Sequence, residues 1–155
     1  MDLSALKEAV STLNADDAFR AKLSDDDWLA LGGLLTRHEI RAGHLLLKQD
    51  ERDDTLYFLE RGSLQVFVTR STPGTHRVAI LRSGSIVGEA GLFGHTPRMA
   101  NVEAMSNCVV WALRGARLDE LAAAQPALAL ALVRAAATVL AVRMRANLER
   151  AVPVS

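Results

Sequence analysis

The spacing of hydrophobic and polar positions changes twice along the chain. Up to about residue 36 apolar residues recur every three or four positions, which predicts helices with one buried face. A first helix is expected from Asp2 or Ser4 to about Leu13. A second should begin at Ser24, because Ser24 and the three aspartates after it form a capping-box start. The apolar face of this second helix would consist of Trp28, Leu31, Leu34 and Leu35.

Between Arg37 and Leu113 the period falls from 3.6 to two, which indicates short strands. The expected strands cover residues 38–41, 45–48, 56–59, 64–69, 77–81, 101–104 and 108–113. Glycines and polar turns separate them, and Pro73-Gly74 fits a type II hairpin turn because proline presets the first central position and glycine accepts a positive φ at the second. Seven or eight short strands at this spacing predict a small antiparallel β-roll or jelly roll.

Helical spacing returns after the strands, with a short helix expected at 117–124. Pro126, a residue favoured at the first helical position, opens a long helix to about residue 150. Its apolar stripe consists of Leu128, Leu132, Ala135, Val139 and Val142, widened by Leu130, Val133 and Leu140. The run 126–142 has 17 residues, which is at the bottom of the membrane-spanning range, and Arg134 near its middle would be costly in a membrane. We expect a soluble helix that is buried on most sides.

The fold expected from this pattern is mainly β with flanking helices, an antiparallel β-roll of about eight strands. One domain should occupy residues 1–155, with a helical N-terminus at 1–36, the roll at 37–114 and C-terminal helices at 115–150. The length of 155 residues agrees with a single domain.

Charge and cysteine content exclude several classes. Eighteen basic and eighteen acidic residues balance, although residues 1–60 carry 13 acidic and 7 basic residues and residues 61–155 carry 5 and 11. A neutral chain argues against a general nucleic-acid binder. The single Cys108, in an apolar run, forms no disulfide framework and is expected in the core. Without a secretory leader, the expected location is the cytoplasm.

The sequence has no motif that supports an enzyme. We find no G-x-S-x-G turn, no cysteine–histidine pair and no phosphate loop of the Walker type. The histidines also lack the spacing of metal ligands, and they are His38, His44, His76 and His95. We therefore expect no catalytic residues, no metal site and no cofactor.

The stretch 87–104, VGEAGLFGHTPRMANVEA, interrupts the strand pattern with small residues, a carboxylate and an arginine. A short helix beginning near Gly88 would present free backbone N–H groups to an anion. Arg98, fixed by the preceding proline, can place its guanidinium on two phosphate oxygens. Glu89 can accept hydrogen bonds from sugar hydroxyls, and the small Ala90 and Ala100 allow close approach of a ligand.

This stretch resembles the phosphate-binding cassette of cyclic-nucleotide-binding domains, which reads roughly G-E-x-[AG]-L, a variable loop, then R-x-A-[TSN]-V. The segment 57–66, YFLERGSLQV, resembles the central strand pair of that family, and Gly84 stands where the family keeps a turn glycine. The resemblance covers about residues 28–145. One departure is the loop 49–54, QDERDD, where the family has glycines; aspartate tolerates the left-handed conformation, so we expect the turn to be kept.

The resemblance implies a role for each cassette residue. Arg98, with the Ala100 amide, would bind the cyclic phosphate, and Glu89, with Gly88, would bind the ribose. The amides of Ala90 and Met99 would complete these contacts. Val78 would form an apolar wall for the base, and a side chain of the last helix would reach the base as a lid, the candidates being Arg134, Thr138 and Arg143. Met99 offers no hydroxyl to a guanine amino group, which favours cAMP over cGMP.

The resemblance implies a non-catalytic sensor whose C-terminal helix moves on binding. Transcription factors of the family append a helix-turn-helix domain, and none follows here, so we expect no nucleic acid partner. We also expect no membrane partner, because the run 126–142 is interpreted as a soluble helix. Output would pass to another protein or to a second copy through the C-terminal helix, or the chain is a piece of a larger protein. The alternative is a degenerate, ligand-free domain in which Glu89 and Arg98 pair with each other and the module serves protein interaction.

Overall fold

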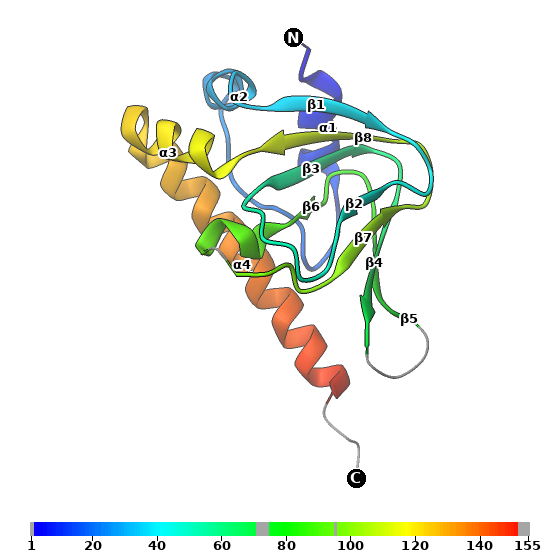
Figure 1. Cartoon of the computed structure of the whole chain (residues 1–155). Helices are drawn as coiled ribbons and strands as arrows, with labels where there is room; N and C mark the ends of the chain where they lie inside the picture. The colour runs from blue at the N-terminus through cyan, green and yellow to red at the C-terminus, as the bar shows by residue number, and fades with distance from the viewer. Residues whose placement is uncertain (1, 71–74, 95, 152–155) are drawn as a thin grey trace.

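The computed structural model describes residues 2–70, 75–94 and 96–151. In this part of the chain eight antiparallel strands form two four-stranded sheets, with helices before and after them (Figure 1). The fold class expected from the sequence is therefore confirmed. The predicted turn at Pro73-Gly74 lies outside the described residues.

One sheet has the order β1-β8-β3-β6 and the other the order β2-β7-β4-β5. The strands of the first sheet are β1 (Thr36–Ile40), β3 (Leu56–Arg61), β6 (Ile86–Val87) and β8 (Cys108–Leu113). Those of the second are β2 (Leu45–Leu47), β4 (Leu64–Thr69), β5 (Thr75–Leu81) and β7 (Asn101–Ala104). The pattern missed β6 because two residues are too few to show alternation.

Strand β8 separates two hydrophobic clusters. Its residues are buried on both faces, because Val109, Trp111 and Leu113 pack with the helices while Cys108 and Val110 pack between the sheets. This explains why its sequence is a continuous apolar run rather than an alternating one. The expected burial of Cys108 is confirmed at 2% exposure.

The N-terminal helices are α1 (Ser4–Thr12) and α2 (Asp25–Gly32). The capping box is present as expected: the Ser24 hydroxyl accepts from the Asp27 N–H at 3.1 Å, and the Asp27 carboxylate accepts from the Ser24 N–H at 3.0 Å. Phe19, in the connection between these helices, meets Phe58 of β3 edge to face at 5.4 Å between ring centroids. The helices thus cover the sheet that contains β3.

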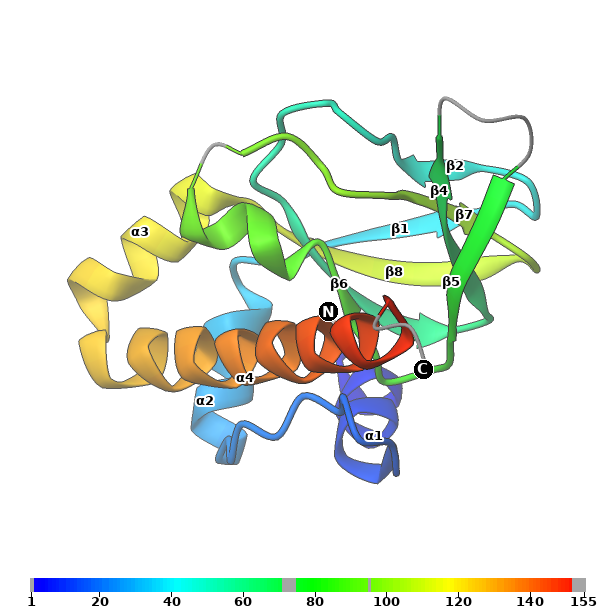
Figure 2. The same cartoon turned by 90° about the horizontal axis from the view of Figure 1, so that it is seen from below.

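The C-terminal helices are α3 (Gly115–Ala124) and α4 (Pro126–Ala151), which follow a short 3-10 turn η1 (Glu89–Phe93) in the chain. In Figure 2, α4 runs past η1 on one side and the N-terminal helices on the other. Leu128, Leu132 and Val139 are buried, as the predicted stripe requires.

The expectation that α4 is buried on most sides is wrong. The helix is long and apolar enough to cross a membrane by length and composition, and only 28% of its most apolar 18-residue window is buried in the structure. Leu130, counted in the predicted stripe, is 50% exposed. Because α4 is rich in alanine and leucine on both faces, its sequence did not show that one face is buried and the other exposed.

Core packing gives a direct test of the helical layer. Leu31 of α2 is fully buried, whereas Leu29 of the same helix is 72% exposed. We expect Leu31→Ala to lower the free energy of unfolding by about 2–5 kcal/mol through lost contacts and a cavity, and Leu29→Ala by less than about 0.5 kcal/mol. Urea denaturation followed by circular dichroism measures both; equal losses would contradict the helical layer described here.

Candidate functional site

The cassette residues lie where β6 leaves the first sheet and the chain returns through β7. The turn η1 begins after Gly88, whose φ of 84° is in the left-handed region that glycine adopts readily. The expected short helix is therefore present as a five-residue 3-10 turn. It contacts both α4 and β3.

Arg98 is almost completely buried, with 5% of its surface exposed. Its Nη2 donates to the Thr55 carbonyl at 2.7 Å and its Nη1 to the Gly88 carbonyl at 3.1 Å. The carboxylate oxygen Oδ2 of Asp53 lies 3.6 Å from Nη2. Among the residues that the structure describes, the buried Nε has no hydrogen-bond partner. A positive charge is thus held inside the protein with one donor unused.

Two glycines make room for this guanidinium. A Cβ atom at Gly88 would lie 2.9 Å from Arg98 Nη1, and one at Gly91 would lie 2.7 Å from the same atom. The Gly91 Cβ would also meet the Asp53 carbonyl oxygen at 2.6 Å. Any larger residue at either position would push the arginine out of its place.

Asp53 and Thr55 hold the other side of the guanidinium. Asp53 Oδ1 accepts from the Thr55 N–H at 2.9 Å and from its hydroxyl at 2.8 Å, which fixes the turn that presents the Thr55 carbonyl to Arg98. Partial burial raises the pKa of Asp53, but the hydrogen bonds from Thr55 and the charge of Arg98 outweigh it, so the pKa lies below its ordinary value.

The acidic loop 49–54 is tied to the end of the cassette by backbone pairing. The Asp50 N–H donates to the Arg98 carbonyl at 2.8 Å, and the Arg98 N–H donates to the Glu51 carbonyl at 2.7 Å. Asp50 has a φ of 73°, so the expectation that an aspartate keeps this turn without glycine is confirmed. The loop that departs from the family pattern therefore helps to position Arg98.

Glu89 is covered by the C-terminal helix. Its side chain is 10% exposed, and its Oε1 lies 2.9 Å from Nη1 of Arg143 on α4. Arg143 also donates through Nε to Asp17 Oδ2 at 2.9 Å and through Nη2 to the Ile86 carbonyl at 2.9 Å. Burial lowers the pKa of Arg143, but Glu89 and Asp17 raise it on balance, so the guanidinium stays charged. This cluster joins the N-terminal connection, the cassette and α4.

Glu89 and Arg98 do not pair with each other. The ligand-free alternative assumed that they would form such a pair. Arg98 turns toward Thr55 and Gly88, while Glu89 turns toward Arg143. Both are nonetheless covered by protein atoms, because as whole residues Glu89 is only 7% exposed and Arg98 only 5%.

The other predicted site residues are spread around this centre. Ala90 and Ala100 are half-buried, and Met99 is 63% exposed. Val78 is half-buried on β5, and its carbonyl accepts from Arg150 of α4 at 2.7 Å.

Of the three lid candidates, the structure brings only Arg143 to the cassette. Arg134 and Thr138 are exposed on α4, where the Thr138 hydroxyl donates to the Arg134 carbonyl at 2.9 Å within the helix.

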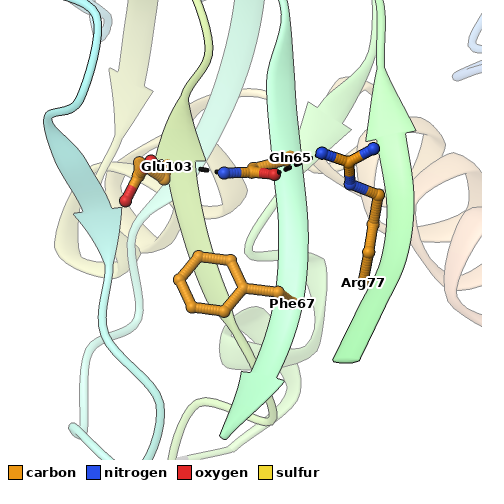
Figure 3. A pocket seen from close by; sticks show the side chains of 4 residues that line it. All are labelled: Gln65, Phe67, Arg77 and Glu103. Atoms are coloured by element: carbon orange, nitrogen blue, oxygen red, sulfur yellow. Dashed lines mark hydrogen bonds between the residues drawn. The ribbon is translucent and has the colours of Figure 1, made fainter. Parts of the chain in front are cut away.

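Two surface hollows lie away from the cassette. One, of about 420 Å³, is on the face of the second sheet opposite the buried Leu64 and Val102, where Gln65 links Arg77 to Glu103 beside Phe67 (Figure 3). The other, of about 650 Å³, lies between α1, α2 and their connection. In the described ranges, no group of three or more histidine, cysteine or acidic side chains is arranged to hold a metal ion.

Sequence reasoning did not single out four residues that position the side chains of Arg98 and Arg143. They are Asp53, Thr55, Gly91 and Asp17. The pattern G-E-x-[AG]-L contains Gly91, so that residue carried a signal. The pairings of Asp53 and Asp17 depend on contacts across 45 and 126 positions, which no local pattern encodes.

The lowered pKa of Asp53 predicts a pH dependence of stability. Because its folded pKa lies below the unfolded value, its ionised form stabilises the protein above about pH 4, and this contribution is lost as pH falls through the folded pKa. We expect Asp53→Asn to cost less than about 1 kcal/mol at neutral pH, since the side chain is 43% exposed. Below pH 4 the difference in free energy of unfolding between Asp53→Asn and wild type should become smaller.

Urea denaturation between pH 3 and 7 measures this gap. The matched control is Asp16→Asn, an exposed carboxylate in the connection between α1 and α2. A gap for Asp53→Asn that stays constant with pH would contradict the charge-dependent role of this carboxylate.

Known proteins share both the sequence pattern and the fold. Residues 37–125 match the family model described as cyclic nucleotide-binding domain. A cAMP-dependent protein kinase regulatory subunit of Blastocladiella emersonii is 32% identical over 91 residues, which are 59% of this chain and 23% of that protein. The chain spans a quarter or less of the length of the curated relatives it matches.

Solved structures agree with the sequence match. A cyclic nucleotide-binding domain from Methylobacillus flagellatus superposes with a TM-score of 0.82 over 96% of this chain and 81% of that one, at 20% identity, which shows the shared fold. The catabolite activator protein of Thermus thermophilus superposes with a TM-score of 0.71 at 26% identity, over 82% of this chain and 58% of that one. The chain belongs to the cyclic nucleotide-binding domain family.

Proposed function

We propose that this chain is a non-catalytic sensor of a 3′,5′-cyclic nucleotide, with cAMP favoured over cGMP. Its ligand would bind at the cassette through Arg98 and Glu89. We further propose that it works as one binding module in the cytoplasm, with neither a membrane nor a nucleic acid as partner. Output would pass through α4 to another protein or to a second copy.

The observation that carries this proposal is the buried guanidinium of Arg98 with its unused Nε. Leaving a buried donor without a partner costs about 1–3 kcal/mol, and more for a charged group. Phosphate oxygens are the acceptors that best match a guanidinium, because both are charged and two parallel hydrogen bonds can form. An anionic ligand here would accept a hydrogen bond from Nε. It would also balance the part of the Arg98 charge that Asp53, at 3.6 Å, does not balance.

The position of Glu89 supports a link between binding and α4. A ribose hydroxyl donating to Glu89 would share the carboxylate with Arg143, which holds it at 2.9 Å. A change in that ion pair would alter how α4 is held against the cassette, because Arg143 belongs to this helix. Ligand binding and the position of α4 are therefore expected to be thermodynamically linked.

The preference for cAMP rests on Met99, which follows Arg98 and lies exposed. A thioether offers no donor to a purine edge, whereas a hydroxyl at this position would be able to bond the guanine amino group. Val78 would contribute the apolar wall for the base, and the amides of Gly88, Ala90, Met99 and Ala100 would complete the phosphate and sugar contacts.

A second candidate function is a ligand-free interaction module. The observation in its favour is that both key side chains are already covered, Glu89 by Arg143 and Arg98 by main-chain atoms of Thr55 and Gly88. Under this alternative the carbonyl contacts are the final partners of Arg98, and no nucleotide binds.

Removal of Arg98 tests the proposal. We expect cAMP to bind the wild-type protein, and Arg98→Ala to weaken binding by roughly thirtyfold to several thousandfold, as truncating a buried charge partner does. The measurement is isothermal titration calorimetry with protein that has been denatured and refolded to remove any bound nucleotide.

The matched control is Arg117→Ala, which removes an exposed arginine from α3 and should bind cAMP as wild type does. Circular dichroism establishes that each protein is folded. Folded wild-type protein that gives no heat with either nucleotide would overturn the sensor and leave the interaction module.

The choice of base has its own test. We expect Met99→Thr to improve cGMP binding relative to cAMP by roughly fivefold, the value of about one hydrogen bond. The ratio of the two dissociation constants, measured by calorimetry, reports it, with Met105→Thr as a control on an exposed methionine after β7. An unchanged ratio would contradict a contact between this position and the base.

A further inference from the structure

The larger of the two surface hollows lies in the N-terminal helical layer, away from the cassette. It has a volume of about 650 Å³ and lies between α1, α2 and the segment 13–24 that connects them. Small-molecule sites in proteins have volumes of about 300–1,000 Å³. We refer to it as the N-terminal hollow, and the lining residues that define it here are Leu13, Phe19, Arg20, Lys22, Leu23 and Trp28.

Much of the wall of the N-terminal hollow is apolar. Phe19 and Trp28 belong to the hydrophobic core, with 3% and 5% of their surfaces exposed. Leu13 and Leu23 are half-buried beside them. An apolar molecule in the hollow would remove from water the surface that these side chains still expose, which is favourable.

The indole of Trp28 has an unused donor at this wall. Among the residues that the structure describes, no acceptor is paired with its Nε1–H, and Arg98 Nε is the only unpaired side-chain atom that is sealed from solvent. Nε1 is therefore open to solvent on the little surface that Trp28 still exposes, which lines the hollow. A largely buried tryptophan usually has an acceptor for this group. A ligand oxygen in the hollow would provide one.

The charged side chains among the described lining residues are both basic. They are Arg20 and Lys22, and both are exposed. Arg20 Nη2 donates to the Ala15 carbonyl at 2.8 Å, which holds the guanidinium beside the connecting segment. Lys22 makes no ion pair within the described part of the chain. Two cations at the rim thus remain available to an anion.

The aspartates of this region do not cancel that charge within the hollow. None of those at positions 16, 17 and 25–27 is a lining residue. Asp17 is paired with Arg143 of α4, and the Asp27 carboxylate is occupied in the capping box of α2. The hollow itself therefore combines an apolar wall, a neutral donor and a basic rim.

We propose that the N-terminal hollow is a binding site for a small amphipathic carboxylate. The apolar body of the ligand would contact Phe19 and Leu23. Its carboxylate, ionised at neutral pH, would accept from the Trp28 N–H or from the two basic side chains. Neither Arg98 nor Glu89 takes part, so this site does not depend on nucleotide binding at the cassette.

The two tryptophans of the chain make a direct test available. Each indole N–H gives its own signal in a two-dimensional proton–nitrogen NMR spectrum of the full chain, and Trp28→Phe identifies one signal by removing it. We expect added octanoate to move the Trp28 signal in a saturable way. The Trp111 signal is the internal control, because its N–H already donates to Glu60 Oε1 at 3.0 Å, and it should stay in place.

A pair of substitutions tests the role of charge. We expect Arg20→Gln combined with Lys22→Gln to weaken octanoate binding about tenfold, because two partly exposed charge contacts are lost. Octanol, which has the same chain length and no charge, should lose less than about twofold in the same protein. Arg41→Gln is the matched control, an exposed arginine after β1, and it should bind octanoate as wild type does.

Four results would overturn the proposal. The first is a Trp28 signal that does not respond to millimolar octanoate, and the second is equal movement of both tryptophan signals, which indicates a general change of the fold. The third is unchanged octanoate binding when Arg20 and Lys22 are both replaced. The fourth is a Trp28 signal that responds to phosphatidylglycerol vesicles but not to octanoate, which would assign the hollow to a membrane surface.

Discussion

The guanidinium of Arg98 lies where water barely reaches it, and a buried cation imposes conditions on every neighbour. Its charge must be balanced and its donors need acceptors, since an unpaired buried charge is among the costliest features a protein can keep. Here two carbonyls and a carboxylate supply part of the balance. The left-handed Gly88, the small Gly91 and the hydrogen-bonded turn at Asp53 and Thr55 all follow from accommodating one side chain.

Glu89 is a buried carboxylate, and Arg143 supplies the positive charge that balances it. One guanidinium serves two acidic partners, Glu89 and Asp17, and a main-chain carbonyl. The carboxylate and the guanidinium of the cassette are thus each held by side chains from outside it, Glu89 by Arg143 and Arg98 by Asp53.

Most of the fold could be predicted because its elements show simple periodicity. Strands such as 64–69 alternate, and the capping box at Ser24 is a local signal, so both were found at nearly the right positions. Strand β6 was missed because it is two residues long. The exposure of α4 was misjudged because a helix rich in alanine and leucine has similar hydropathy on both faces, and only the packed structure separates them.

The sequence pattern singled out Glu89 and Arg98 as candidate site residues, but it did not predict the contacts that hold their side chains. Glu89 and Arg98 stand in a recognisable pattern, whereas the partners that orient them are distant in the chain. Asp17 lies 126 positions from Arg143, and Thr55 lies 43 positions from Arg98. Such pairings arise from how the roll and helices pack, which hydrophobic spacing alone does not specify.

The family match covers residues 37–125. The two residues that form an ion cluster with Glu89, Asp17 and Arg143, both lie outside this segment. Asp17 precedes the matched segment by twenty positions, and Arg143 follows it by eighteen. A fragment cut at the borders of the match would keep the cassette but leave its buried carboxylate without a cation. The unit that must be kept intact for this cassette to hold its geometry is therefore longer, at both ends, than the segment by which the family is recognised.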